Sequence, residues 1–538
     1  MRPRRRNANA LASEGTGGAS DEADALDLDR RDRSDVSILA NRGLLTLVGG
    51  AASGTLSFLA IVVVTHGLRP SSAGQFFVGV GVFSIASHVL LLGSDIGLLR
   101  SISADRAQSL GRAPQLLRIA TVPIFVISTL VAAGLFASIP SLARLLSHGA
   151  SSDQMTIYLR ALVIALPVAV VYLACVSATR GFGTVTPFVL IERVARPLLQ
   201  VLFLAAVVTM GLGGVALAGA WVIPFGMGFA VVLWWLSRAI RRELPREPTP
   251  GHDREWTRLA VGFWRFATPR GLAAIFQVLI LWLDTLLIGL FRTPAEVAIY
   301  TTSTRCVLLA SFVTIALTQA VTPQIGEFVT GREMGRAEGV FRTATVWGIL
   351  VTWPLLLTLA IFAPVVLAIF GQLYTEGQLA VVILALSMMV SVACGPVDWV
   401  LLMAGKSTWN LINTAVALGL NVGLNLVLIP RLGIVGAAIA WAVSIIVNNV
   451  APLIEVMTFF RIDPFGPGYR LVSAAALFCF GVPGVFFSLV LGHSVPALVV
   501  STTLGCLAYI AVLRRSSGAI HAAELRDVAR FRGRPRDR

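Results

Sequence analysis

The sequence contains few charged residues and few cysteines for a chain of 538 residues. Charged residues make up 13%, about half the share of a typical soluble domain, which argues against water as the main solvent. The basic residues include a single lysine, Lys406. All five cysteines fall inside apolar stretches without close pairing along the chain, so neither a disulfide framework nor a metal cluster is indicated. We expect no metal and no cofactor.

Nucleotide-binding and catalytic motifs are also missing. Gly405-Lys406-Ser407 resembles the end of a phosphate-binding loop, but Val400 stands where the first glycine belongs, and the context is a short turn between apolar runs. No catalytic triad stands out. These absences argue against a nucleotide-driven pump and against an enzyme.

What the chain has in abundance is apolar sequence, with 56% hydrophobic residues. A helix needs roughly 20 mostly apolar residues to cross a bilayer. Fourteen stretches meet this requirement, near 43–65, 74–99, 119–138, 157–178, 187–210, 214–236, 266–290, 297–322, 342–362, 378–403, 408–429, 433–459, 470–491 and 495–513. The sequence therefore predicts an all-α integral membrane protein with about fourteen transmembrane helices.

The formal net charge of +15 is distributed by topology. Most arginines fall in the even-numbered connections between the predicted spans, whereas the odd-numbered connections hold only Arg69, Arg144, Arg292 and Arg431. By the positive-inside rule, this asymmetry predicts that both termini are cytoplasmic. Because the charge is explained in this way, we expect no nucleic-acid partner.

An internal repeat divides the apolar region. The segment 432–441 (LGIVGAAIAW) echoes 212–221 (LGGVALAGAW) at an offset of 220 residues. A duplicated unit of six spans predicts two bundles related by a pseudo-twofold axis along the membrane normal. The predicted organisation is a disordered tail at 1–38, bundles at 39–237 and 261–460 joined by a cytoplasmic linker at 238–260, two extra helices at 461–513 and a basic tail at 514–538.

Ionisable residues at membrane depth are costly and point to function. The span 266–290 carries Arg270, Gln277 and Asp284 at intervals of seven, close to one stripe of a helix. The next span carries Arg305, whose guanidinium suits phosphate oxygens. Two interpretations stay open for Arg305: it contacts an anionic substrate, or it neutralises Asp284 and only stabilises the fold.

Further polar residues lie in three other spans. Glu192 and Arg196 are four residues apart and can pair, although their place near a helix end favours extension toward the interface. Asp398 is a candidate for ion coupling, as are Asp284 and Glu192. Asn421 and Asn425 lie in a polar stripe that suits either sugar hydroxyls or hydrogen bonds between helices.

Several ordered motifs resemble one known family. They are Asn425–Ala438 (NLVLIPRLGIVGAA), Asp284–Gly289 (DTLLIG) followed by Glu296–Tyr300 (EVAIY), and Ala73–Phe76 (AGQF) followed by Leu92–Gly97 (LGSDIG). Over about residues 40–513 the chain resembles the Wzx-like polysaccharide flippases. They belong to a superfamily that also holds lipid II flippases and multidrug exporters.

The resemblance implies a V-shaped pair of six-helix bundles around a cationic cavity in the cytoplasmic membrane. It implies outward movement of a polyprenyl-pyrophosphate-linked oligosaccharide by alternating access, with Arg305 and Arg270 as the leading diphosphate contacts. Candidate partners are that substrate, membrane lipids and other polysaccharide-assembly proteins. The first bundle departs from the family in having few interior charges.

Two alternatives are weighed against this interpretation. A cation-coupled multidrug exporter would share the fold but would present carboxylates and aromatic groups in the cavity. A membrane-embedded polysaccharide polymerase or ligase needs a sizeable external loop, whereas the longest external connection, about 139–156, is short and carries one carboxylate, Asp153.

Overall fold

The computed structural model describes residues 45–108, 110–147, 152–243, 253–331 and 333–532, and these ranges are helical with short connections and contain no strand. Residues Gly49–Arg538 form one compact unit. The helices discussed below lie in this unit, apart from the first turn of the helix that begins at Leu45.

The first half of the described chain contains eight helical elements. They are Leu45–Gly67, α2 (Pro70–Leu91), α3 (Ser94–Ala107), α4 (Ala113–Leu146), α5 (Ser152–Gly181), the π-helix η1 (Phe188–Ala195), α6 (Arg196–Thr209) and α7 (Gly214–Glu243).

The second half continues with longer helices and several short ones. They are α8 (Asp253–Phe291), α9 (Pro294–Thr330), α10 (Met334–Ile361), α11 (Ala363–Ala368), η2 (Gln372–Gly377), α12 (Gln378–Cys394), α13 (Val397–Met403), α14 (Ser407–Leu432), α15 (Ile434–Glu455), η3 (Val456–Phe460), α16 (Pro467–Ala476), η4 (Leu477–Gly481), α17 (Val482–Val490) and α18 (Val495–Arg532).

Twelve of the fourteen predicted spans coincide with a helix of the described ranges that is long and apolar enough to cross a membrane. The two remaining predicted segments are helical as well: 187–210 coincides with η1 and α6, and 297–322 lies within α9. The two echoing segments of the repeat occupy equivalent places, since both lie at the start of a helix, α7 and α15.

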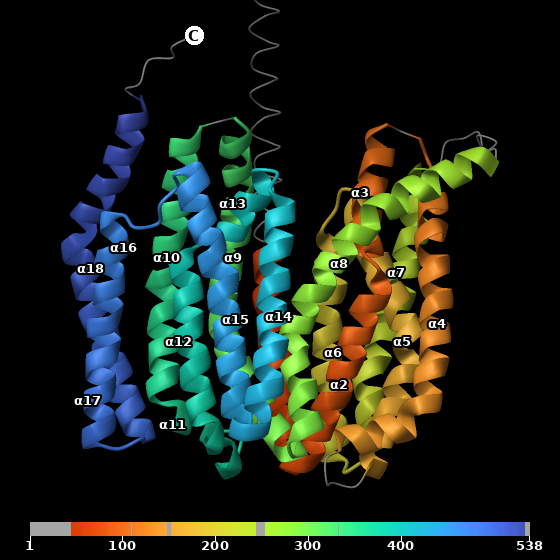
Figure 1. Ribbon diagram of the computed structural model, residues 1–538, viewed down its shortest axis with the longest axis horizontal. Coiled ribbons are helices and arrows are strands. Elements are labelled where there is room, and N and C mark those ends of the chain that lie inside the picture. The colour runs from red at the N-terminus through yellow and green to blue at the C-terminus, as the bar shows by residue number, and fades with distance from the viewer. Residues whose placement is uncertain (1–44, 109, 148–151, 244–252, 332, 533–538) are drawn as a thin grey trace, which may run out of the picture. The chain divides into compact units, whose positions relative to one another are not determined.

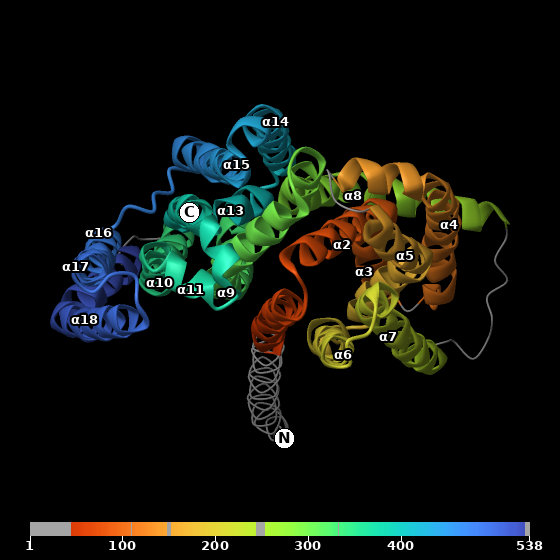
Figure 2. The same ribbon diagram turned by 90° about the horizontal axis from the view of Figure 1, so that it is seen from below.

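Within the unit Gly49–Arg538 the helices pack in two groups (Figures 1 and 2). Helices α2, α4, α5 and α7 pack on one another, as do α9, α10, α12 and α15. Helix α2 also packs on α8 and α9, and α14 packs on α8, which joins the groups. The last helices, α16 to α18, pack on α10. This arrangement confirms two bundles with a C-terminal addition.

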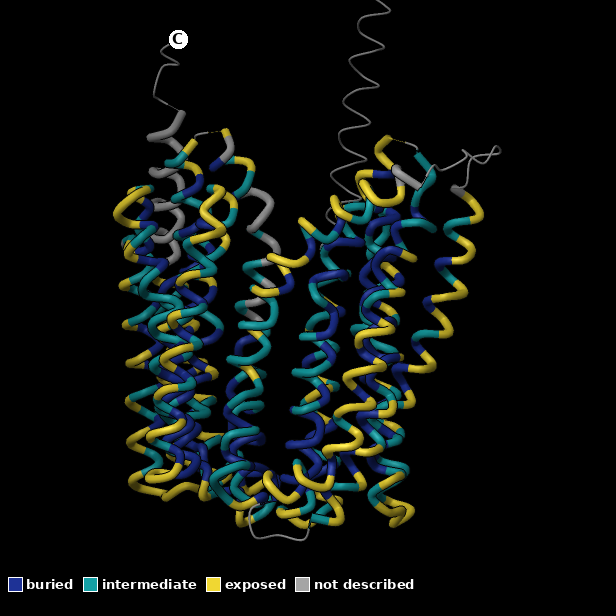
Figure 3. Tube along the Cα trace, turned by 45° about the vertical axis from the view of Figure 1, so that its right-hand side comes forward, coloured by how far each residue is buried: buried dark blue, intermediate teal, exposed yellow. Residues whose placement is uncertain are grey.

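Exposed residues run along the outermost helices (yellow in Figure 3), and many large apolar residues are exposed. Leu130 on α4 is 69% exposed and Leu489 on α17 is 80% exposed. A water-soluble protein rarely exposes such continuous apolar surface, whereas lipid tails solvate it without cost. The exposed surface therefore agrees with a multi-pass membrane protein.

Two predicted spans, 74–99 and 378–403, are each divided into two helices, which corrects the expectation of continuous helices there. The first breaks at Leu92 and Gly93, both with positive φ (50° and 76°), where the backbone touches α8 at Gly271. The second breaks between α12 and α13 at Gly395 and Pro396. The counting of apolar runs missed both breaks because it tolerates single polar residues, although Gly93 and the pair Gly395-Pro396 are residue types that commonly end helices.

The predicted tails and linker extend beyond the described chain. The tail at 1–38 lies outside it, as do residues 244–252 of the linker and residues 533–538. The described parts are helical: α7 continues to Glu243, α8 begins at Asp253, and α18 continues through most of the predicted basic tail to Arg532. The domain boundaries themselves stay a prediction.

Candidate functional site

Asp284 lies at the centre of a buried polar group formed by α8, α9 and α14. The Tyr300 hydroxyl donates a hydrogen bond to Asp284 Oδ2 (2.7 Å), and Asn425 Nδ2 donates to Asp284 Oδ1 (2.7 Å) and to Asn421 Oδ1 (3.1 Å). Asp284 is 2% exposed. The carboxylate is thus held by neutral donors at a depth where water does not reach it.

Local sequence explains how these side chains meet. Helix α9 starts with Pro294 in its first turn, and the Thr293 hydroxyl accepts a hydrogen bond from the Glu296 N–H, a typical N-terminal cap. The resulting short turn places α8 and α9 side by side. Asp284, about two turns before the end of α8, therefore meets Tyr300, about two turns into α9.

Asn421 and Asn425 of α14, which the sequence predicts as substrate contacts, are fully buried in this structure. Asn421 and Asn425 are both 0% exposed, and Asn421 Nδ2 and Asn425 Oδ1 have no hydrogen-bond partner among the described residues. No surface of either side chain is open to a ligand in this conformation. The structure places them beside Asp284 because asparagines four residues apart share one helix face.

Arg305 does not pair with Asp284. Its guanidinium lies over the indole ring of Trp282, 4.4 Å from the ring centroid, and it forms no ion pair within the described ranges. A cation over an indole face gains about 0.5–2 kcal/mol and keeps its N–H donors free. Of the two interpretations drawn from the sequence, neutralisation of Asp284 is not seen, and contact with an anion stays a prediction.

Arg270 and Gln277 lie on the exposed side of α8. The Arg270 guanidinium is 5.7 Å from the centroid of the Phe266 ring, and that of Arg100 on α3 is 4.0 Å from the same centroid. One aromatic ring thus holds two cations from two helices. Arg270 and Gln277 stay predictions as substrate contacts.

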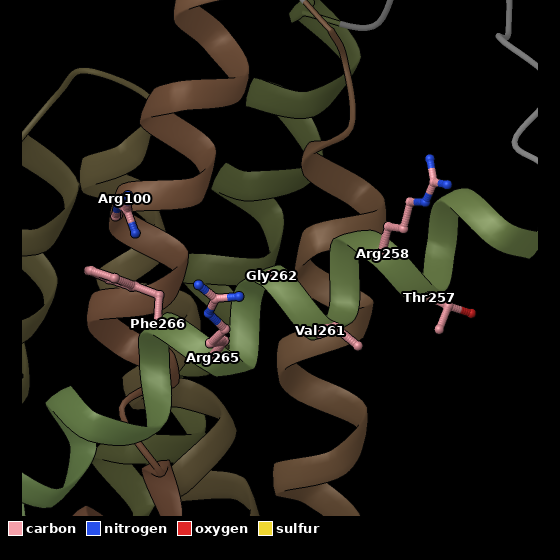
Figure 4. A pocket seen from close by; sticks show the side chains of 7 residues that line it. All are labelled: Arg100, Thr257, Arg258, Val261, Gly262, Arg265 and Phe266. Atoms are coloured by element: carbon pink, nitrogen blue, oxygen red, sulfur yellow. The ribbon is translucent and has the colours of Figure 1, made fainter.

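A cavity of about 610 Å³ adjoins this ring. Figure 4 shows Arg258 and Arg265 rising from the same side of α8, with Arg100 approaching from α3. These three arginines are exposed and form no ion pair in the described part of the chain. The cavity therefore carries positive charge that the fold itself does not neutralise.

The first bundle contains a mostly buried ion pair between Glu192 and Arg196. Arg196 donates to both carboxylate oxygens of Glu192 (2.7 and 2.9 Å), and the two side chains are only 16% and 14% exposed. The pairing of Glu192 with Arg196 is thus present in the structure. The Tyr172 hydroxyl donates to Glu192 (2.7 Å) and Gln200 accepts from Arg196 (3.0 Å).

Sequence reasoning missed Tyr172 and Tyr300. Both are almost fully buried, and each donates to a carboxylate on another helix. A signal was present, since the chain has six tyrosines and a tyrosine inside an apolar span needs a partner for its hydroxyl.

A second cavity, of about 350 Å³, lies in the second bundle and is lined by Asp398. Asp398 Oδ1 is buried and has no hydrogen-bond partner among the described residues.

The five thiols are free, and four of them are buried, as expected for packing residues.

Comparison with known proteins places these features in context. Residues 38–329 match the family model described as "Polysaccharide biosynthesis protein", and residues 269–427 match the MatE model. A curated relative is the "Probable low-salt glycan biosynthesis flippase Agl15" of Haloferax volcanii, 27% identical over 235 residues. The match covers 43% of this chain and 49% of the relative, so the chain spans about half the length of that protein.

Two solved structures share the fold. "Lipid II flippase MurJ, inward closed conformation" has a TM-score of 0.68 at 11% identity, over 89% of this chain and 99% of that one. An inward-facing multidrug resistance MATE family transporter of the MOP superfamily has a TM-score of 0.63 at 18% identity, over 78% and 95%. At such low identity these structures establish the architecture alone.

Proposed function

Because the chain belongs to the family of polysaccharide biosynthesis proteins, we propose that it is a flippase. Its substrate is an oligosaccharide linked to a polyprenyl diphosphate, and it moves this lipid across the cytoplasmic membrane by alternating access. The protein performs no covalent chemistry. The name of the Haloferax relative and the fold shared with a lipid II flippase support this assignment.

The observation that carries the proposal is the unpaired Arg305. A diphosphate bears about two to three negative charges, and moving it unpaired through hydrocarbon costs many kcal/mol. An arginine inside a predicted span, with no acidic partner among the described residues, offers fixed donors to that group. A drug exporter for cations has no need of this positive charge.

The arginines around Phe266 extend the same argument. Arg100, Arg258 and Arg265 line one cavity, and Arg270 shares the Phe266 ring with Arg100. We assign this cavity to the cytoplasmic entrance, where it attracts the diphosphate before transfer. The positive-inside distribution supports this orientation, with both termini in the cytoplasm.

The buried carboxylates supply candidates for energy coupling. Asp284 and Glu192 are each held between helices by a tyrosine and by a further donor. A proton or cation at such a group changes the contacts between helices. We keep Asp284, Glu192 and Asp398 as coupling candidates.

Transport in reconstituted vesicles tests the assignment. A fluorescent polyprenyl-diphosphate oligosaccharide is followed as it becomes accessible on the opposite leaflet. Arg305→Ala abolishes movement while membrane expression stays normal, and Arg305→Lys restores part of it because lysine keeps the charge but loses the planar donor set. The control is Arg144→Ala, an exposed arginine that contacts its own helix. Full activity of Arg305→Ala contradicts the assignment.

A second candidate function is a cation-coupled multidrug exporter, which the MatE match over residues 269–427 favours. Efflux of cationic dyes from cells separates the two functions. The flippase assignment predicts no dye efflux, and efflux that is lost in Asp398→Asn but kept in Arg305→Ala supports the exporter instead.

A further inference from the structure

Trp282 on α8 contacts both the guanidinium group of Arg305 and helix α2. The Arg305 guanidinium is 4.4 Å from the centroid of the Trp282 ring. A Cβ at Gly81 of α2 would lie 3.5 Å from Cε3 of the same residue. Helix α2 packs with the first bundle and α9 with the second (Figure 2). One indole ring therefore connects the candidate substrate contact of the second bundle with a helix of the first.

The helical repeat explains why Arg305 meets Trp282 rather than Asp284. Successive residues of an α-helix are turned by about 100°, so Trp282 and Asp284, two residues apart, point in directions about 160° apart. Asp284 accepts hydrogen bonds from Tyr300 and Asn425, whereas Trp282 contacts α2 and Arg305. Helix α8 thus keeps the carboxylate away from the guanidinium, and Arg305 retains its positive charge without an acidic neighbour on that helix.

The indole ring determines where the N–H donors of Arg305 point. A guanidinium is planar and carries its five N–H donors around its edge, so a ring against its face leaves these donors available. In the described part of the chain, this guanidinium has no ion pair and no hydrogen bond besides the ring contact. The ring contact is therefore the interaction that orients a long and otherwise flexible side chain.

Gly81 allows α2 to support the ring from the first bundle. Leu286 also lies against this glycine, with Cδ2 at 3.2 Å from where a Cβ would stand. A single methyl group would need only a small adjustment, but a branched side chain would enter the space that Trp282 and Leu286 occupy. The position of the ring, and with it that of Arg305, thus depends on the contact between α2 and α8.

We propose that Trp282 is a positioning residue for Arg305. It holds the guanidinium in the orientation that receives a diphosphate, and it makes anion binding at Arg305 depend on the contact between α2 and α8. The identity of the anion rests on the proposed function. Because linkage is reciprocal, a diphosphate bound at Arg305 in turn stabilises this contact between the two bundles.

Thermal unfolding of the purified full-length protein in detergent measures anion binding without any lipid substrate. Inorganic diphosphate is titrated at constant pH, with sodium gluconate keeping the ionic strength fixed. A ligand that binds the folded state alone raises the unfolding temperature in a saturable way. The cavity lined by Arg100, Arg258 and Arg265 also attracts anions, so the part of the rise that Arg305→Ala removes defines binding at Arg305.

Substitutions of the ring test the positioning role. We expect Trp282→Leu to raise the half-saturating diphosphate concentration about tenfold, equivalent to about 1.4 kcal/mol. Trp282→Phe keeps an aromatic face and should raise it only about two- to threefold, because phenylalanine attracts a cation less strongly than tryptophan does. The matched control is Trp347→Leu on α10, at a tryptophan that is 51% exposed, and it should leave the half-saturating concentration unchanged.

A substitution on α2 tests the support from the first bundle. Gly81→Val keeps both Trp282 and Arg305 but crowds the ring, so we expect it to raise the half-saturating concentration about threefold. Its control is Gly134→Val, at a glycine whose Cβ would meet open space. In the Arg305→Ala background, Trp282→Leu should cause no further loss of diphosphate binding, because the two residues act as one unit.

The outcomes separate this proposal from the proposed function. An unchanged half-saturating concentration in Trp282→Leu overturns the positioning role, as do equal effects of Trp282→Leu and Trp282→Phe, and an unchanged value in Gly81→Val overturns the support by α2. If Trp282→Leu does not fold, values unchanged in Trp282→Phe and Gly81→Val contradict the proposal. A response that Arg305→Ala does not reduce overturns both the proposal and Arg305 as the diphosphate contact. Diphosphate binding in the expected order without lipid transport refutes the flippase assignment instead.

Discussion

The buried pair of Glu192 and Arg196 allows a quantitative prediction about the first bundle. Arg196→Met removes two contacts to Glu192, one to Gln200 and a cation–ring contact with Phe225 at 4.7 Å. Glu192 keeps the Tyr172 hydroxyl. Removing one partner of a buried pair costs about 3–5 kcal/mol, because the remaining charge stays buried without compensation.

The same substitution at an exposed pair provides the control. Arg336 and Glu333 are 2.6 Å apart, with side chains 53% and 49% exposed. Surface pairs are worth about 0–1 kcal/mol, so Arg336→Met should change the free energy of unfolding by no more than that. The two arginine variants therefore differ mainly in burial.

The assay is reversible unfolding in mixed micelles with increasing denaturing detergent. The double variant Glu192→Gln with Arg196→Met removes both charges and keeps an acceptor for Tyr172, so it should be at least about 2 kcal/mol more stable than Arg196→Met alone. The buried pair would be refuted if the effects of the two substitutions on the free energy of unfolding were additive. It would also be refuted if Arg196→Met lowered that free energy by less than about 1 kcal/mol.

Two further predictions concern the second bundle and the contact between α2 and α9. Tyr300→Phe removes one of the hydrogen bonds to the buried Asp284 and should lower the free energy of unfolding by about 1.5–3 kcal/mol in the same assay. An unchanged free energy of unfolding would contradict the hydrogen bond between Tyr300 and Asp284. Gly74→Ala places a Cβ against the Pro294 carbonyl and should destabilise by about 1–3 kcal/mol. Gly134→Ala, which meets open space, should stabilise by up to about 1 kcal/mol, and equal effects at the two glycines would contradict the close contact.

Much of the architecture follows from the apolar runs. A bilayer leaves no water for unpaired backbone groups, so an apolar stretch of about 20 residues must be helical. The predicted spans agree with the helices for this reason, and the echo at 212–221 and 432–441 anticipated equivalent places in α7 and α15.

The candidate site could be predicted only in part. Intramembrane charge drew attention to Asp284, Arg305 and Glu192, and the spacing of four residues predicted the pair with Arg196. The partners across helices were not predictable, because spacing along one helix says nothing about which neighbour faces it. Hence Tyr300, rather than Arg305, contacts Asp284.

The sequence by itself determined the class of fold and the position of nearly every span, because lipid imposes a length and a polarity on each helix. The tertiary structure alone decided which polar groups meet, where the helices break, and that Asp398 lines a cavity while Asn421 and Asn425 do not contact solvent. The physical reason is that both faces of a membrane helix are apolar, so the rotation of each helix is set by close contacts such as Gly74 against Pro294 and by hydrogen bonds between helices.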